Sequence, residues 1–72
     1  MQAGDLVRIK RSEKLLNPWR GYALNGVAMT VKNAASRDPS APPRIKVVDP
    51  VSLRHEWFDG DELELLRHGR RP

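Results

Sequence analysis

The sequence predicts a small all-β domain, a barrel of four to five short antiparallel strands with one long Pro/Ala-rich loop. Apolar and polar residues alternate in short segments, which is typical of strands with one buried face. Gly, Pro, Asn and Asp cluster between these segments, where turns are expected. No segment shows a long helical pattern. A chain of 72 residues holds one such domain, and closing the sheet would remove its exposed edges.

The strands are predicted from the alternation of apolar with polar or charged residues. The predicted strands are residues 6–11, 27–32, 44–49 and 53–58, followed by a closing strand or short helical turn at 63–66. In the fourth, Leu53, His55 and Trp57 share one face, which we expect to face the core, and Phe58 lies on the opposite face. The predicted core is Val7, Ile9, Val27, Met29, Val31, Ile45, Val47, Leu53, Trp57, Leu63 and Leu65.

The segment between the first two strands allows two structures. Residues 12–18 are expected to form a loop, in which 13–16 could form one helical turn that stops before Pro18. Asn25-Gly26 is a strong hairpin signal, so residues 22–24 could pair back against the following strand. Alternatively, an irregular loop ends at Gly26. Both interpretations stay open.

Two further segments are expected outside the strands. Residues 33–44 contain three prolines and no apolar residue larger than Ala, which indicates an exposed loop, disordered rather than functional. Asp59-Gly60-Asp61 has the composition of a tight turn. We expect residues 1–66 to form the domain and residues 67–72 to form a flexible basic tail.

Composition narrows the class of protein. Thirteen Lys and Arg against nine Asp and Glu give a net charge of +4, which suits nucleic acid or an acidic protein surface. There is no cysteine for a disulfide or a thiolate zinc site. No apolar run is long enough for a membrane span and no signal-peptide pattern is evident, so a cytoplasmic protein without membrane association is expected.

Catalysis has little support in the sequence. His55 lies between charged strand residues and His68 lies in the predicted tail, where catalytic geometry could not be held. The acidic turn at 59–62 is too short for a calcium loop, and no phosphate-binding glycine loop is present. We therefore expect no enzymatic activity, no cofactor and no metal.

Two groups of residues are candidates for binding. Aromatic side chains that could anchor a protein partner are Trp19, Tyr22 and Phe58. Basic side chains that could contact phosphates are Arg8, Lys10, Arg11, Arg20, Lys32 and Lys46. A solvated, charged strand face is the alternative for the basic group.

Three segments resemble SH3-like small barrels: Gly4-Asp5-Leu6-Val7-Arg8-Ile9, Gly26-Val27-Ala28-Met29-Thr30-Val31, and Glu56-Trp57-Phe58 followed by Leu63-Glu64-Leu65-Leu66. The first two are similar to the KOW-type barrels of transcription and ribosomal proteins. The last is more similar to small SH3-like proteins of tailed bacteriophages. Gly21 and Gly26 are five residues apart, wider than the closely spaced glycines of KOW motifs.

The resemblance implies fold more strongly than function, because such barrels host unrelated functions. It favours a non-enzymatic phage-type accessory protein, either a virion or assembly component or a factor that binds a host protein. The alternative is a KOW-like module that contacts nucleic acid or the transcription or translation machinery, and a small oligomeric enzyme is the least favoured. A host or viral protein is thus the expected partner, nucleic acid is the alternative, and self-association stays open. The expected location is the host cytoplasm or the virion.

Overall fold

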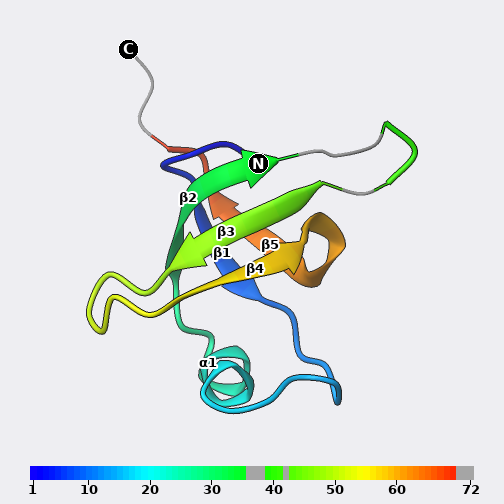
Figure 1. Cartoon of the computed structure of the whole chain (residues 1–72). Helices are drawn as coiled ribbons and strands as arrows, with labels where there is room; N and C mark the ends of the chain where they lie inside the picture. The colour runs from blue at the N-terminus through cyan, green and yellow to red at the C-terminus, as the bar shows by residue number, and fades with distance from the viewer. Residues whose placement is uncertain (36–38, 42, 70–72) are drawn as a thin grey trace.

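The computed structural model describes residues 1–35, 39–41 and 43–69, which form one antiparallel sheet with a short helix at one end (Figure 1). The elements are β1 (Leu6–Ile9), α1 (Trp19–Asn25), β2 (Met29–Ala35), β3 (Arg44–Val48), β4 (His55–Asp59), the 3-10 helix η1 (Gly60–Glu62) and β5 (Leu63–Arg67). The five strands lie in the order β4-β3-β2-β1-β5. The prediction of a small all-β, barrel-like fold of four to five antiparallel strands is confirmed.

The core lies on one face of the curled sheet because apolar residues alternate along the central strands. Val7 and Ile9 of β1 are buried, as predicted, and so are Ile45 and Val47 of β3. An extra residue in β2, between Val31 and Asn33, shifts its register with β3. Such a bulge bends a strand and increases its twist. The whole buried apolar cluster is Val7, Ile9, Leu15, Ala23, Met29, Val31, Ile45, Val47, Phe58 and Leu63.

The predicted orientation of β4 is wrong. Phe58 pairs with Ile45 and is only 5% exposed, whereas Trp57 pairs with Lys46 on the other face and is half-buried. Leu53 precedes the strand and is 70% exposed. The pattern within one strand does not determine which face is inward, because the register with β3 decides it.

Other members of the predicted core are also less buried than expected. Val27 is partly buried against the core. Leu65 and Leu66 of β5 are exposed, so Leu63 alone of these three residues joins the core. In the part of the chain that the structure describes, β5 is an edge strand with β1 as its one strand neighbour.

The segment before β2 forms a helix, so neither the hairpin nor the irregular loop is correct. α1 ends at Gly26, which adopts a left-handed conformation with φ of 63°. The Gly26 N–H donates to Ala23 O, and the Val27 N–H donates to Tyr22 O at 3.0 Å. This is the hydrogen-bond pattern of a glycine-terminated helix. Asn25-Gly26 therefore signals a helix end here rather than a hairpin.

The predicted loop at 33–44 is shorter in the structure. Residues 33–35 belong to β2 and pair with β3. Pro39, Ser40 and Ala41 are exposed, and residues 36–38 and 42 lie outside the described part of the chain. The predicted turn at 59–61 is confirmed by η1, where the Asp59 N–H donates to the Glu62 carboxylate at 2.8 Å.

The two ends of the described chain meet at Asp5. Its buried carboxylate accepts hydrogen bonds from the N–H groups of Gln2 at 2.9 Å and Gly69 at 2.6 Å. A Cβ atom on Gly69 would lie 2.5 Å from the carbonyl carbon of Gly4, so glycine permits this approach. β5 extends to Arg67, past the predicted boundary at 66, and residues 70–72 of the predicted tail lie outside the described residues. In the described residues, α1 is far too short to cross a membrane.

Candidate functional site

The three aromatic residues predicted to bind a protein lie together, and they pack α1 onto the sheet. The ring centroids of Trp19 and Tyr22 are 5.4 Å apart, and those of Trp19 and Phe58 are 5.9 Å apart, both edge-to-face. Phe58 was expected on the outer face but is buried, and Trp19 and Tyr22 are half-buried. These contacts favour a packing role for Trp19 over that of a fully exposed anchor.

The connection between β3 and β4, residues 49–54, is built around the carboxylate of Asp49. Its Oδ1 accepts the Val51 N–H at 2.9 Å and its Oδ2 accepts the Ser52 hydroxyl at 2.9 Å. The main chain is closed by two further bonds, from Asp49 N–H to Arg54 O and from Leu53 N–H to Asp49 O, both 2.8 Å. We call this segment the 49–54 loop. Its backbone is fixed by hydrogen bonds at both ends.

The negative charge of the Asp49 carboxylate is stabilised by the hydrogen bonds that it accepts. The hydrogen bond from the Val51 N–H lowers the pKa of the Asp49 carboxyl below its usual value of 3.8, and bonds from Tyr22 and Ser52 lower it further. The hydroxyls of Tyr22 and Ser52 also lie 3.2 Å apart, which connects the loop to α1. The carboxylate therefore stays ionised at neutral pH and organises the loop.

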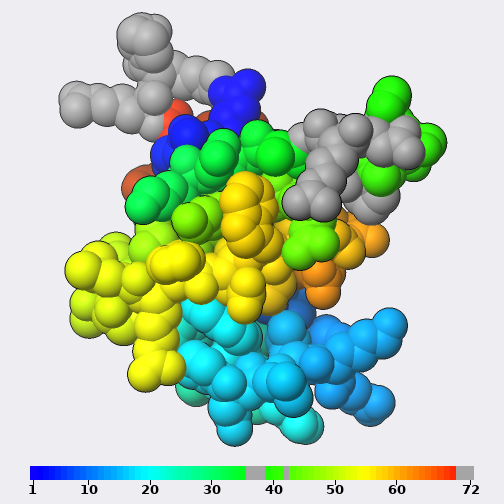
Figure 2. All heavy atoms as spheres, viewed as in Figure 1, coloured from blue at the N-terminus to red at the C-terminus, as the bar shows by residue number. Residues whose placement is uncertain are grey.

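The 49–54 loop is the yellow-green connection on the left of Figure 1, and it exposes two apolar side chains to solvent. In Figure 2 the yellow atoms of this region lie next to the cyan atoms of the α1 region. Val51 is 90% exposed and Leu53 is 70% exposed. Leu53 also has φ of 63°, a left-handed conformation that residues with a branched apolar side chain rarely adopt. The strands predicted at 44–49 and 53–58 leave only residues 50–52 between them as a short link. Asp49-Pro50 is typical of a turn, but no sequence signal indicates the left-handed leucine.

The six basic residues predicted to contact phosphates fall into two groups. Lys32 lies at the bulge of β2, and Lys46 lies on the outer face of β3 with its Nζ 6.0 Å from the centroid of Trp57. The other four, Arg8, Lys10, Arg11 and Arg20, line two hollows between β1 and α1. Lys32 and Lys46 lie on the paired strands β2 and β3, whereas the other four gather beside α1.

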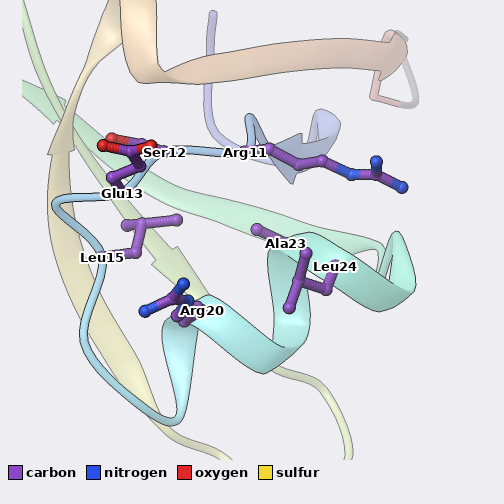
Figure 3. A pocket seen from close by; sticks show the side chains of 7 residues that line it. All are labelled: Arg11, Ser12, Glu13, Leu15, Arg20, Ala23 and Leu24. Atoms are coloured by element: carbon purple, nitrogen blue, oxygen red, sulfur yellow. The ribbon is translucent and has the colours of Figure 1, made fainter.

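The two hollows adjoin because both are lined by Arg11 and Ala23. The first, with a volume of about 290 Å³, is shown in Figure 3 and is lined by Arg11, Ser12, Glu13, Leu15, Arg20, Ala23 and Leu24. The second, of about 360 Å³, is lined by Arg8, Ile9, Lys10, Arg11, Ala23 and Glu64. We call the pair the α1 crevice. Within the α1 crevice, Arg8 forms an ion pair with Glu64, with an Nη2–Oε2 distance of 2.6 Å.

The side chains that could support catalysis or metal binding do not gather into a site among the described residues. His55 and His68 are both exposed. The residues that the structure describes contain no group of three His, Asp or Glu side chains placed to hold a metal ion. Among the described residues, the 49–54 loop exposes apolar side chains on a hydrogen-bonded backbone, and the α1 crevice gathers four cations.

No protein-family model, curated protein or solved structure matches this chain.

Proposed function

We propose that this chain is a non-enzymatic binding module that contacts another protein through the 49–54 loop. The observation that carries the proposal is the exposure of Val51 and Leu53 on a segment fixed by hydrogen bonds. A preorganised loop loses little conformational freedom when it binds, so more of its contact energy appears as affinity. Binding residues commonly lie on loops held by a rigid scaffold.

The conformation of Leu53 supports a role for its side chain. A left-handed backbone costs an ordinary L-residue about 1–2 kcal/mol, and Asn or Gly adopts it more readily. Leucine at this position carries that cost and also exposes an apolar group to water. Strained residues cluster at ligand clamps and other functional sites. A partner that buries Leu53 would account for its presence.

The surroundings of the loop indicate the chemistry of the partner. Arg54 and His55 follow Leu53 and are exposed, and the one carboxylate of the loop, Asp49, is engaged within it. We expect an apolar hollow with an acidic rim on the partner. Together with the resemblance to small phage barrels, this favours an accessory protein that contacts a virion or host protein.

The test compares Leu53→Asn with Leu16→Ser in a pull-down from bacterial lysate, with and without nuclease. Asn keeps the left-handed backbone and removes the apolar side chain, so capture of the partner should fall at least about tenfold while the fold persists. Leu16 is 77% exposed but lies outside the loop, so its replacement should leave capture unchanged.

Thermal melts of both variants accompany the pull-down. We expect Leu53→Asn to unfold at the same or a higher temperature than the unmodified chain. A partner that Leu53→Asn retains and Leu16→Ser loses would contradict the proposal, and so would capture that disappears on nuclease treatment.

Nucleic acid binding is the second candidate, favoured by the convergence of Arg8, Lys10, Arg11 and Arg20 on the α1 crevice. If they contact phosphates, log Kd for duplex DNA should change with log salt by about 0.9 per contact. Anisotropy titrations at several salt concentrations measure this slope. Because Arg8 is paired with Glu64, we expect fewer phosphate contacts than the four cations of the α1 crevice would allow.

A further inference from the structure

The α1 crevice combines an apolar floor with free cations. Leu15 and Ala23 are buried at its base, and Leu24 is exposed at its side. In the view of Figure 3, Leu15 and Ala23 lie on two sides of the hollow, Arg20 lies below Leu15, and the side chain of Arg11 extends away from them. Neither guanidinium makes an ion pair within the described ranges of the chain.

The charges that line the crevice do not cancel. Arg8 and Glu64 neutralise each other at 2.6 Å. Three cations, Lys10, Arg11 and Arg20, then remain against the single carboxylate of Glu13, an excess of two positive charges. A concave site with one sign of excess charge attracts ligands of the opposite sign.

We propose that the α1 crevice binds an acidic peptide segment of a partner protein, with an apolar side chain flanked by Asp or Glu. The guanidinium groups of Arg11 and Arg20 present paired N–H donors, which match carboxylates in bidentate geometry. The apolar side chain enters between Leu15 and Leu24. This inference goes beyond the contact proposed for the 49–54 loop, because it uses a different surface and a different ligand chemistry.

The lining favours a peptide over nucleic acid. Glu13 lines the crevice beside Arg11 and Arg20 and would repel a backbone that carries a charge at every phosphate. No aromatic residue of the described chain lines either hollow, so bases have no ring on which to stack. A peptide can place its carboxylates opposite Arg11 and Arg20 and leave uncharged groups opposite Glu13.

The test is fluorescence anisotropy with a fluorescein-labelled acidic peptide that carries a central pair of leucines. The full chain should bind this peptide, and the same peptide with Gln and Asn in place of its acids should bind at least about tenfold more weakly, since charge-assisted hydrogen bonds are lost. The double variant Arg11→Gln/Arg20→Gln should lose a similar factor.

The matched control is Lys32→Gln/Lys46→Gln, which removes the same charge from residues that do not line the crevice. Its affinity for the acidic peptide should be unchanged. Equal loss in both double variants would mean that net charge alone attracts the peptide, and the proposal would be wrong. Circular dichroism checks the fold, and if the first double variant is unfolded, Arg11→Gln alone decides the outcome.

A second pair of measurements tests the apolar floor. Leu24→Ser should remove a preference of about tenfold for the leucine peptide over one with serines, because the leucine of the peptide would lose the apolar surface against which it is buried. Absence of that preference in the unmodified chain would contradict the insertion between Leu15 and Leu24.

Three outcomes separate this inference from its alternatives. Leu53→Asn should bind the acidic peptide as tightly as the unmodified chain does. Partner capture by Leu53→Asn therefore tests the 49–54 loop, and peptide binding by Arg11→Gln/Arg20→Gln tests the α1 crevice, so either proposal can be wrong without the other. No binding of the peptide at millimolar concentration would overturn the inference. Tighter binding of a single-stranded oligonucleotide, lost in Arg11→Gln/Arg20→Gln, would assign the crevice to nucleic acid and also overturn it.

Discussion

The carboxylates of Asp5 and Asp49 are both buried and both accept hydrogen bonds from backbone N–H groups, but they connect different parts of the chain. Asp5 precedes β1 and binds the N–H of Gly69, 64 residues away. Asp49 follows β3 and binds the N–H of Val51 and the hydroxyl of Ser52, two and three residues away. The first carboxylate holds distant segments together, and the second shapes a single loop.

A buried carboxylate that accepts backbone hydrogen bonds can therefore stabilise the whole fold, as Asp5 does, or shape one surface loop, as Asp49 does. Loss of a long-range hydrogen bond frees a chain segment, and holding that segment in place without the bond costs conformational entropy. Loss of a local hydrogen bond changes the conformation of a few residues and leaves the sheet intact. We therefore expect Asp5 substitutions to affect unfolding and Asp49 substitutions to affect binding.

The largest effect is expected for Asp5→Ala. It leaves the N–H groups of Gln2 and Gly69 without their charged acceptor, which costs on the order of 3 kcal/mol. Urea unfolding measures the loss, and Asp5→Asn, which keeps one carbonyl acceptor, should lose less. Equal stability of Asp5→Ala and the unmodified chain would show that the contact with Gly69 is not formed in solution.

Gly69→Ala tests the same contact from the other side. The added Cβ would meet the backbone of Gly4, so the segment must move and its hydrogen bond to Asp5 is lost, at a cost of about 1–2 kcal/mol. Unfolding of the double variant with Asp5→Ala should show that the two costs do not add. Additive costs would mean that Gly69 contributes through something other than Asp5.

Asp49→Ala should affect unfolding less than Asp5→Ala. The Val51 N–H loses its acceptor, so hydrogen exchange at Val51 should accelerate and partner capture through the 49–54 loop should fall. Exchange at the amides of β1 and β5 provides the internal control and should stay slow. Loss of protection throughout the sheet would remove the distinction between the two carboxylates.

The smallest effect is a pH dependence confined to the loop. Because the Val51 N–H lowers the pKa of Asp49 in the folded chain, the ionised carboxylate stabilises the loop above the usual pKa of 3.8. This contribution is lost as the pH falls through the lower, folded pKa. The amide shift of Val51 should titrate with a midpoint below 3.8, and Asp49→Asn should abolish the titration. A midpoint above that value would mean that the carboxylate is not engaged.

Strands in which apolar and polar residues alternate clearly could be predicted from the sequence. Features that depend on pairing or packing with other segments could not. β1 and β3 carry buried apolar residues at every second position, so their faces were correct. β4 offers Trp57 and Phe58 on opposite faces, and pairing with β3 selected Phe58. α1 has only seven residues, too few for its helical periodicity to stand out.

The candidate surfaces were predictable only in their residue types. Four of the six basic residues gather because α1 packs beside β1, a contact that no local pattern announced. The 49–54 loop depends on the side chain of Asp49 and the backbone of Leu53, which are tertiary and conformational details. Phe58 was predicted to bind a partner because the predicted orientation of β4 placed its side chain on the outer face, whereas it is buried.

The β2–β3 connection offers an attachment point for labels and solid supports. It joins the end of β3 opposite to the one that leads into the 49–54 loop, and Pro39, Ser40 and Ala41 are exposed (Figure 1). The five residues of β3 hold the two connections roughly 13–16 Å apart. Doubling the length of a loop adds only about 0.6 kcal/mol to the cost of closing it, so a tag inserted beside the exposed Ala41 should be tolerated. A chain immobilised there would present the 49–54 loop to solution in one orientation.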